Sequence, residues 1–306
     1  MKRILLFSLL FLVSVLIWYL FIKKYDYEFQ MESRYGPGVA FYEISDWRNF
    51  SPKSKNKDII ITKSTPFESI TQKLMSDNSD VLEMYWEFNR KNDSVTTISL
   101  SVGTSINELA NRWAIVNPFR TSVYIDSLKQ RVLEFKKRLN DVQQTYKVSL
   151  DSKITSSPEM NCICHSSSNI PIDSKASEML GTIGYLENYV LERDLELTGP
   201  PFIKITSWNK VENVIAFDFC FPVNLAQDIK PTLEVSFREF KSSSALKAIF
   251  NGNYRLSHLA WYDLLDKATE SGLNTNSLPL EIFYNNPKVE ANSESWKAEI
   301  YLPVME

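Results

Sequence analysis

The chain has 306 residues, 44% of them hydrophobic and 13% aromatic, which is enough for about two domains with separate cores and argues against disorder. The 34 basic and 37 acidic side chains nearly cancel, so no strong electrostatic field favours nucleic acid as a direct partner. The three cysteines cannot all pair within one chain and match no four-ligand zinc spacing, and they leave the redox compartment undetermined.

The N-terminal segment from Ile4 to Ile22 is uncharged and lies between two pairs of basic residues. As a helix it would be about 28 Å long, close to the hydrocarbon thickness of a bilayer. A cleaved signal peptide is the alternative, but bulky residues from Trp18 to Ile22 stand where small residues precede a cleavage site. The sequence therefore predicts a retained single-pass membrane anchor over residues 1–24. Its orientation stays open, because basic residues flank both ends.

Strand patterns and then a helical pattern follow the apolar segment. The clearest strand alternates apolar and polar side chains from Leu82 to Phe88, which predicts one buried face. A reversal at Arg90 to Asp93 predicts an antiparallel hairpin with the next strand. After Pro118 the period becomes helical, with an apolar stripe of Ile125, Leu128, Val132, Phe135, Leu139 and Val142. The other predicted elements are strands at Tyr25 to Ser33, Ile59 to Thr62, Ser69 to Leu74 and Thr96 to Val102, and a short helix or turn at Pro37 to Asp46.

This order of elements resembles the SRPBCC (START-like) helix-grip family, in membrane-anchored versions fused to an effector-binding domain. The resemblance rests on the stretch Phe41 to Phe50 and on the amphipathic helix that ends near Leu139. Between Phe50 and Ile59 the chain has too few residues for the extra strands and loop of such domains. The resemblance therefore implies a truncated SRPBCC-like domain over residues 25–149.

The C-terminal half repeats one order of elements. Polar residues from Asp151 to Glu159 predict a domain boundary near residue 150. Beyond it, strand, helix, strand and strand occur twice, which predicts an α+β fold. The first set is Met160 to His165, Asp173 to Arg193, Phe202 to Trp208 and Val214 to Phe221; the second is Ala245 to Phe250, Leu256 to Glu270, Glu281 to Tyr284 and Ala298 to Leu302.

Five ordered motifs in this half resemble the GyrI-like family, also called the AraC-type or transcription-activator effector-binding domain. They are Gly199-Pro200-Pro201-Phe202, Phe221-Pro222-Val223, Gly252-Asn253-Tyr254, the segment Pro279 to Pro287 and the segment Glu299 to Val304. The segment from Pro279 resembles the family's Glu-x-Tyr-x-x-x-Pro signature, with Glu281 at the glutamate position. Phe283 stands where the family usually has tyrosine, and Tyr284 follows it.

The resemblance implies that residues 150–306 form a duplicated βαββ domain with an antiparallel sheet and a ligand groove between its halves. In relatives that sense lipophilic cations, aromatic rings line the groove and the signature glutamate is a buried counter-charge. A poorly hydrated carboxylate beside aromatic rings would attract a flat cation. The expected ligand-binding residues are Glu281, Phe283, Tyr284, Trp261, Tyr254, Trp208 and Phe202.

Structural roles compete with these assignments. Glu281 alone, without the motif, would be an edge-strand carboxylate facing water, and the aromatic residues, Tyr262 included, could simply pack a core. If Glu281 is buried and unpaired, its replacement by Gln should weaken cation binding and leave the stability of the fold almost unchanged or raise it.

The cysteines and histidines favour structural roles. Cys162 and Cys164 share one strand face and His165 points the other way, which predicts small buried hydrophobic side chains instead of a shared metal site. The second histidine, His258, lies in a predicted helix, so the sequence offers few histidines for a catalytic nucleophile–histidine pair. No glycine-rich phosphate loop, HExxH or GxSxG motif is present.

The sequence thus predicts a membrane-anchored, non-catalytic binding module without a cofactor. The resemblance to the GyrI-like family implies that its ligand is a small lipophilic molecule, with cations among the candidates. Relatives often carry a helix-turn-helix region ahead of this domain, and none is readable in this sequence, which disfavours direct binding of nucleic acid. Two alternatives stay open. One is a protein-interaction or inhibitory module like the gyrase-inhibitory relatives. The other is a small-molecule hydrolase that uses Glu281 with a hydroxyl group within hydrogen-bond reach.

Overall fold

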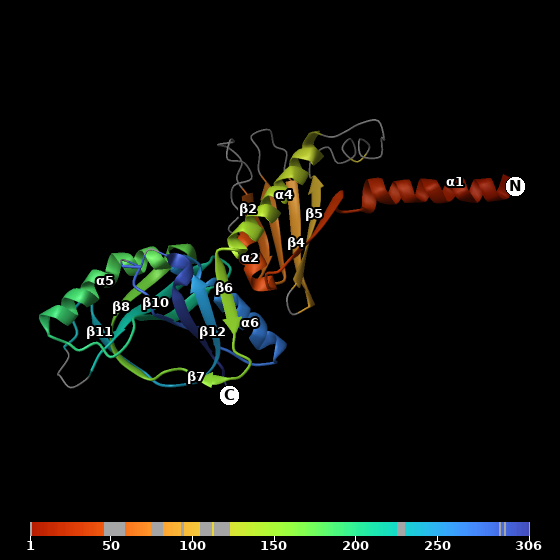
Figure 1. Cartoon of the computed structure of the whole chain (residues 1–306). Coiled ribbons are helices and arrows are strands. Elements are labelled where there is room, and N and C mark those ends of the chain that lie inside the picture. Colours follow the sequence, from red (N-terminus) through yellow and green to blue (C-terminus); the bar gives the residue numbers. More distant parts are fainter. Residues whose placement is uncertain are drawn as a thin grey trace. The chain divides into compact units, whose positions relative to one another are not determined.

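The chain forms two compact units, Met1–Asn140 and Asp141–Glu306 (Figure 1). The computed structural model describes residues 2–45, 59–74, 82–92, 95–104, 112, 123–224, 230–287, 289–290 and 292–305. Each unit has its own antiparallel sheet. The two are therefore described separately.

The predicted N-terminal membrane anchor is wrong. The α-helix α1 runs from Lys2 to Ile17, 16 residues, and a π-helical turn, η1 (Trp18–Ile22), follows it. An α-helix of that length rises about 24 Å, less than the roughly 30 Å core of a bilayer. Within the described ranges, no helix combines the length and the apolar character needed to cross a membrane. The single-pass anchor and the membrane location are thus corrected.

The first unit is built on a five-stranded sheet in the order β1-β5-β4-β3-β2. The predicted hairpin is confirmed, because β4 and β5 pair in antiparallel register, and the predicted long helix packs Phe135 on Trp86 with ring centroids 5.9 Å apart. Residues 46–50 of the predicted early-helix stretch lie outside the described residues. The elements are β1 (Tyr27–Ser33), α2 (Pro37–Ser45), β2 (Ile59–Thr65), β3 (Ser69–Leu74), β4 (Leu82–Asn92), β5 (Val95–Thr104) and α4 (Val123–Gln143).

The second unit is a sheet with the strand order β11-β8-β10-β9-β13-β14-β12-β6, and β7 pairs with β12. All its pairings are antiparallel, and β9 joins β13 where the two halves meet. The predicted repeat is confirmed as β8-α5-β9-β10 followed by β12-α6-β13-β14. Its elements are β8 (Met160–Pro171), η2 (Ile172–Ser174), α5 (Lys175–Glu192), β9 (Phe202–Asn209), β10 (Val214–Pro222), β12 (Ser244–Gly252), η3 (Tyr254–Leu256), α6 (Leu259–Glu270), β13 (Leu280–Phe283), η4 (Ser293–Ser295) and β14 (Lys297–Pro303).

Three strands of this unit were not predicted. They are β6 (Tyr146–Leu150), β7 (Thr155–Ser156) and β11 (Ser236–Phe240), which are short and mostly half-buried or exposed. Such segments bury no continuous apolar face, so their alternation is weak in the sequence. β6 lies before the predicted domain boundary at residue 150 and pairs with β12.

Gly252 lets β6 approach β12 closely. Its φ is +145°, and a Cβ placed there would lie 2.7 Å from the Cβ atom of Tyr146. Replacing Gly252 by Ala should therefore lower the free energy of unfolding by about 1–3 kcal/mol. Gly181 is the matched control, since a Cβ there meets nothing within 4 Å and Ala should stabilise α5 by about 0.5–1 kcal/mol. Urea unfolding of both variants tests this, and equal effects would contradict it.

Candidate functional site

Glu281 lies on the central strand β13 and faces the helices. It pairs with Ile203 of β9 and Ile300 of β14, and its side chain is fully buried. Because side chains alternate along a strand, the neighbouring Leu280 and Ile282 point to the opposite face of the sheet. The carboxylate therefore lies between the sheet and the helices α5 and α6, which supply its partners.

Lys175, the first residue of α5, neutralises the Glu281 carboxylate. Its Nζ atom donates to Glu281 Oε2 at 2.6 Å and to Ser257 Oγ at 2.7 Å. The Ser257 hydroxyl lies 2.9 Å from both Glu281 Oε2 and the carbonyl of Tyr254, and its one hydrogen serves one of them. Trp261 Nε1 donates to Glu281 Oε1. We call Lys175, Ser257, Trp261 and Glu281 the ion-pair cluster.

The ion-pair cluster is shielded from water. Lys175 is 1% exposed, and the other three residues are fully buried. Burial lowers the pKa of Lys175 from its ordinary value, while the Glu281 carboxylate acts in the opposite direction. A buried charge without a partner is costly, so each member of the pair makes burial of the other tolerable.

Aromatic rings surround the Lys175 ammonium. Its Nζ lies 5.1 Å from the ring centroid of Trp261 and 5.7 Å from that of Phe283, both within the range of a cation–π interaction. The Tyr254 ring lies 4.8 Å from the Phe283 ring. Lys175 thus lies between a carboxylate and aromatic rings.

Two other titratable groups border the cluster. Burial, and then the nearby Lys175 charge, lower the pKa of His258 to about 3, so this imidazole is neutral at pH 7. Burial raises the pKa of Tyr254 to about 12. The Tyr254 hydroxyl donates to the carbonyl of Lys297 at 2.8 Å and accepts from the Asn285 backbone at 3.0 Å. The Tyr254 hydroxyl is therefore engaged by backbone groups.

Trp208 joins this aromatic region from β9. Its ring lies 5.3 Å from the rings of both Trp261 and Tyr262, in edge-on contacts. Its Nε1 atom is buried, and no residue in the described part of the chain accepts its hydrogen bond. An indole N–H usually finds a partner when buried, so this donor is an exception within the described part of the chain.

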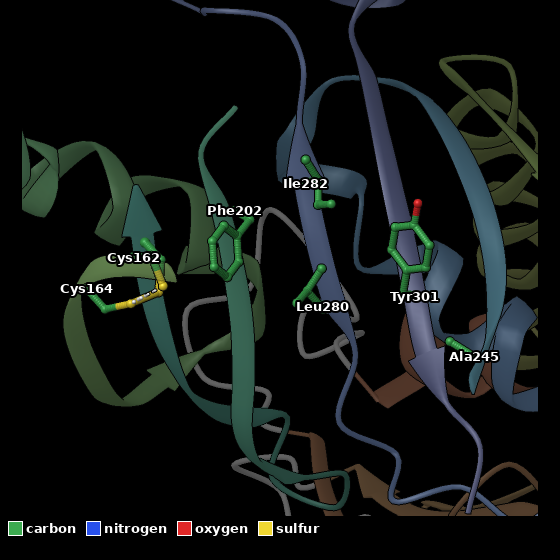
Figure 2. Close-up of a cluster of buried hydrophobic side chains, with 8 residues drawn as sticks. Cys162, Cys164, Phe202, Ala245, Leu280, Ile282 and Tyr301 are labelled. Carbon is green, nitrogen blue, oxygen red and sulfur yellow. Dashed lines mark hydrogen bonds between the residues drawn. A yellow bond between two sulfur atoms is a disulfide. The ribbon is translucent and has the colours of Figure 1, made fainter. Parts of the chain in front are cut away.

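Phe202 and Tyr284 lie away from Glu281. Phe202 pairs with Ile282 and belongs to the cluster on the opposite face of the sheet, with Cys162, Cys164, Cys220, Ala245, Leu280, Ile282 and Tyr301 (Figure 2). The Tyr284 side chain is 47% exposed and donates to Glu299 at 3.1 Å. Of the seven expected site residues, the structure brings five together: Glu281, Phe283, Trp261, Tyr254 and Trp208.

A separate pocket of about 480 Å³ lies beside Tyr284. Ile282 is part of its wall, and the Ile282 side chain points away from the face that Glu281 occupies. Residues of two sequence motifs, Gly199-Pro200 and Pro222-Val223, also line it. This pocket therefore lies on the face of the sheet opposite to the ion-pair cluster.

Sequence reasoning missed Lys175, and this overturns the expectation of an unpaired carboxylate. The missed signal is in the sequence: Lys175 falls three residues after Ile172 and four before Met179, on the apolar stripe of the predicted helix. A lysine on an apolar stripe is rarely buried without a carboxylate partner. The corrected expectation is that loss of either charge destabilises the fold.

The comparison with protein families matches residues 150–305 to the GyrI-like small molecule binding domain. No curated protein matches the chain. Among solved structures, the EcmrR C-terminal domain is 19% identical with a TM-score of 0.44, over 53% of this chain and 98% of that one. An uncharacterised conserved protein from Listeria innocua is 13% identical with a TM-score of 0.36, over 56% and 98%. SAV2435 bound to tetraphenylphosphonium is 12% identical with a TM-score of 0.33, over 52% and 93%.

The family match covers just over half of the chain and contains all five sequence motifs. It begins at residue 150, so the resemblance of residues 25–149 to SRPBCC domains stays a prediction. The antiparallel sheet and the repeated βαββ order agree with the resemblance that those motifs carry. The chain therefore belongs to the GyrI-like family, with a small molecule binding domain at residues 150–305.

Proposed function

We propose that the C-terminal domain is a non-catalytic effector-binding module whose ligand is a small lipophilic cation that takes the place of Lys175 beside Glu281. The observation that supports this most is the surroundings of the Lys175 ammonium: a buried carboxylate at 2.6 Å and the rings of Trp261 and Phe283. A chain that holds its own cation in such a place has the chemistry to hold another.

Ligand and Lys175 compete in this proposal. The ligand gains the charge of Glu281 and stacking on the rings, while Lys175 has to move from the cluster into water. Binding requires a state in which Lys175 has left the cluster. The apparent affinity is therefore the intrinsic affinity multiplied by the fraction of the protein in that state. Trp208 Nε1, buried without a described acceptor, adds a hydrogen-bond donor for a ligand oxygen.

The contacts support binding over hydrolysis. A hydrolase would need a hydroxyl group poised between Glu281 and a substrate. The Tyr254 and Tyr284 hydroxyls bond to the Lys297 carbonyl and to Glu299 instead. The hydroxyl that reaches Glu281 belongs to Ser257, which is fully buried and bonded within the cluster.

Glu281→Gln should weaken the binding of tetraphenylphosphonium by about 1–3 kcal/mol, because the variant keeps the side-chain shape and loses the charge. Isothermal titration calorimetry with the full chain measures this, and neutral triphenylphosphine oxide should not bind Glu281→Gln more weakly than the wild type. Glu299→Gln is the matched control: Glu299 pairs with Ile282 on the next strand, so it lies on the opposite face. Equal affinity of wild type and Glu281→Gln for the cation would reject the proposed site.

A further inference from the structure

All three cysteines of the chain meet at one point of the sheet. The Sγ atoms of Cys162, Cys164 and Cys220 lie within 4.8 Å of one another, and all three residues are fully buried. Cys162 and Cys164 are two residues apart on β8 and share a face, while Cys220 of β10 lies directly opposite Cys164. The convergence of every thiol in the chain is the observation from which this inference starts.

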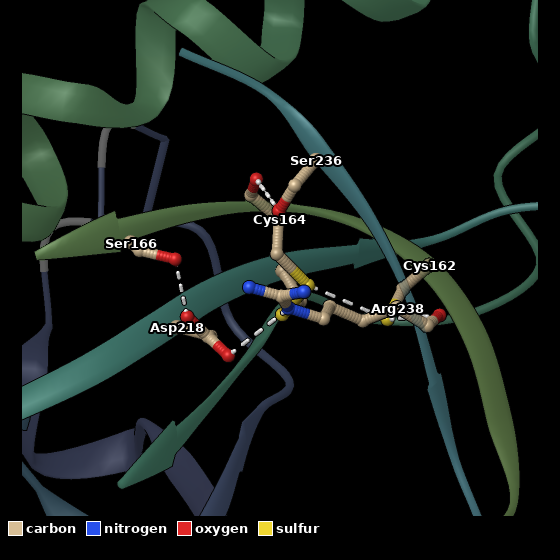
Figure 3. Close-up of a disulfide and its surroundings, with 7 residues drawn as sticks. Cys162, Cys164, Ser166, Asp218, Ser236 and Arg238 are labelled. Carbon is tan, nitrogen blue, oxygen red and sulfur yellow. Dashed lines mark hydrogen bonds and ion pairs between the residues drawn. A yellow bond between two sulfur atoms is a disulfide. The ribbon is translucent and has the colours of Figure 1, made fainter. Parts of the chain in front are cut away.

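The sulfur atoms differ in their bonding. Cys164 and Cys220 form a disulfide, and Cys162 is free (Figure 3). Cys162 Sγ lies 3.5 Å from Cys164 Sγ and donates to the carbonyl of Arg238 at 3.4 Å. Reduction of the disulfide by two electrons and two protons would leave three adjacent thiols. Three thiols are therefore available together only in the reduced protein.

Burial selects the charge of the ion that such a site holds. The three cysteines belong to a cluster with Phe202, Leu280 and Ile282. The charged groups beside them, Asp218 and Arg238, pair with each other at 3.6 Å, so a further net charge at the sulfur atoms is costly. Three thiolates with a monovalent or a divalent ion leave a net negative charge, whereas three thiolates with a trivalent ion leave none. Thiolates also prefer soft ions. Trivalent arsenic meets both conditions.

The pocket of about 480 Å³ lies beside the cysteine cluster. Met160 and Pro222 line this pocket; Met160 lies two residues before Cys162 on the same strand face, and Pro222 pairs with Cys162 in the ladder. Ile282 lines the pocket and also belongs to the cysteine cluster. A small neutral molecule in the pocket is thus separated from Cys162 by single side chains.

We propose that Cys162, Cys164 and Cys220, once their disulfide is reduced, form a three-sulfur site for trivalent arsenic. Arsenous acid, As(OH)₃, condenses with three thiols to give As(SR)₃ and three water molecules. Each As–O bond is replaced by an As–S bond, each thiol hydrogen leaves in a water molecule, and no electrons are transferred. The product is uncharged, as the apolar surroundings require.

Arsenite uptake by the full chain tests the proposal. A water-soluble trialkylphosphine reduces the disulfide, taking its oxygen atom from water to become the phosphine oxide, and is then removed. After arsenite is added, native mass spectrometry should show one arsenic per chain in place of three hydrogens. X-ray absorption at the arsenic edge should show three sulfur neighbours. The oxidised chain should take up none.

Cys162→Ala separates a three-sulfur site from a simple dithiol. This variant keeps Cys164 and Cys220, so its reduced form should bind arsenite at least about tenfold more weakly, with two sulfur neighbours. Thermal melts of the reduced proteins are the second readout, because an ion that binds the native state raises the melting temperature. No uptake by the reduced chain, equal affinity in Cys162→Ala, or uptake only with loss of the cooperative melt would each overturn the proposal.

Discussion

Lys175→Met should lower the free energy of unfolding by about 3–5 kcal/mol, because it leaves the Glu281 carboxylate buried without its counter-charge. Methionine has a similar length and keeps the apolar packing of the lysine stem. The double variant Lys175→Met/Glu281→Gln removes both charges and should regain most of the loss, since a buried pair is often no more stable than well-packed neutral side chains. Urea unfolding of the four proteins gives the coupling energy directly.

Lys247→Met is the matched control for this cycle. Lys247 pairs with Glu299 at 3.1 Å in the same domain, but Glu299 also accepts from Lys297, Tyr284 and Tyr301. Because these donors remain, Lys247→Met should lower the free energy of unfolding by less than Lys175→Met does. A Lys175→Met loss no larger than that of the control, or a double variant as unstable as the sum of the single ones, would contradict a mutually dependent pair.

The pH dependence of the stability of Glu281→Gln is a second test of the Lys175–Glu281 pair. Burial already lowers the pKa of Lys175, and Glu281 opposes that shift, so removing the carboxylate should lower this pKa further. Below the ordinary lysine pKa the unfolded variant then binds a proton that the folded variant does not. Stability of Glu281→Gln should therefore rise with pH towards that value, relative to the double variant, which lacks Lys175. Parallel stability curves of the two would contradict this.

Lys175→Met should also bind tetraphenylphosphonium about tenfold to a hundredfold more tightly than the wild-type chain, because the competing internal cation is gone and Glu281 remains. This change is opposite in sign to its effect on stability. A merely structural lysine would not produce that combination. Calorimetry of Lys175→Met and of Lys175→Met/Glu281→Gln with the cation distinguishes a gain that depends on Glu281 from a general loosening of the fold.

The two variants make this prediction refutable. If Lys175→Met/Glu281→Gln binds the cation as tightly as Lys175→Met, the gain comes from new space and not from Glu281. If the affinity of Lys175→Met for the cation equals that of the wild type, Lys175 does not compete with the ligand. Lys175→Met/Glu281→Gln should lose the gain in affinity for the cation, because it lacks the Glu281 carboxylate.

The strands and helices with a strong period were predictable from the sequence. The alternation from Leu82 to Phe88 and the repeated βαββ order both appear in the structure, because burial of one face imposes a period that the sequence must follow. The apolar segment from Ile4 to Ile22 misled, since uniform hydrophobicity says nothing about where an α-helix ends. Its regular part ends at Ile17.

The partners of the site residues were not predictable to the same degree. Glu281 was identified by its motif, but its pairing with Lys175 depends on how α5 lies on the sheet. Phe202 was assigned to the same site although a strand register, Phe202 with Ile282, places it on the other face. The meeting of Cys220 with Cys164 is likewise a matter of register. Contacts between distant segments follow from tertiary packing, which a single sequence does not contain.

A crystal structure of the full chain with tetraphenylphosphonium tests the central claim most directly. The account predicts the phosphonium beside the Glu281 carboxylate, against the rings of Trp261 and Phe283, with Lys175 Nζ moved away from Oε2. A phosphonium bound in the pocket beside Tyr284, with the Lys175–Glu281 pair still intact, would contradict it.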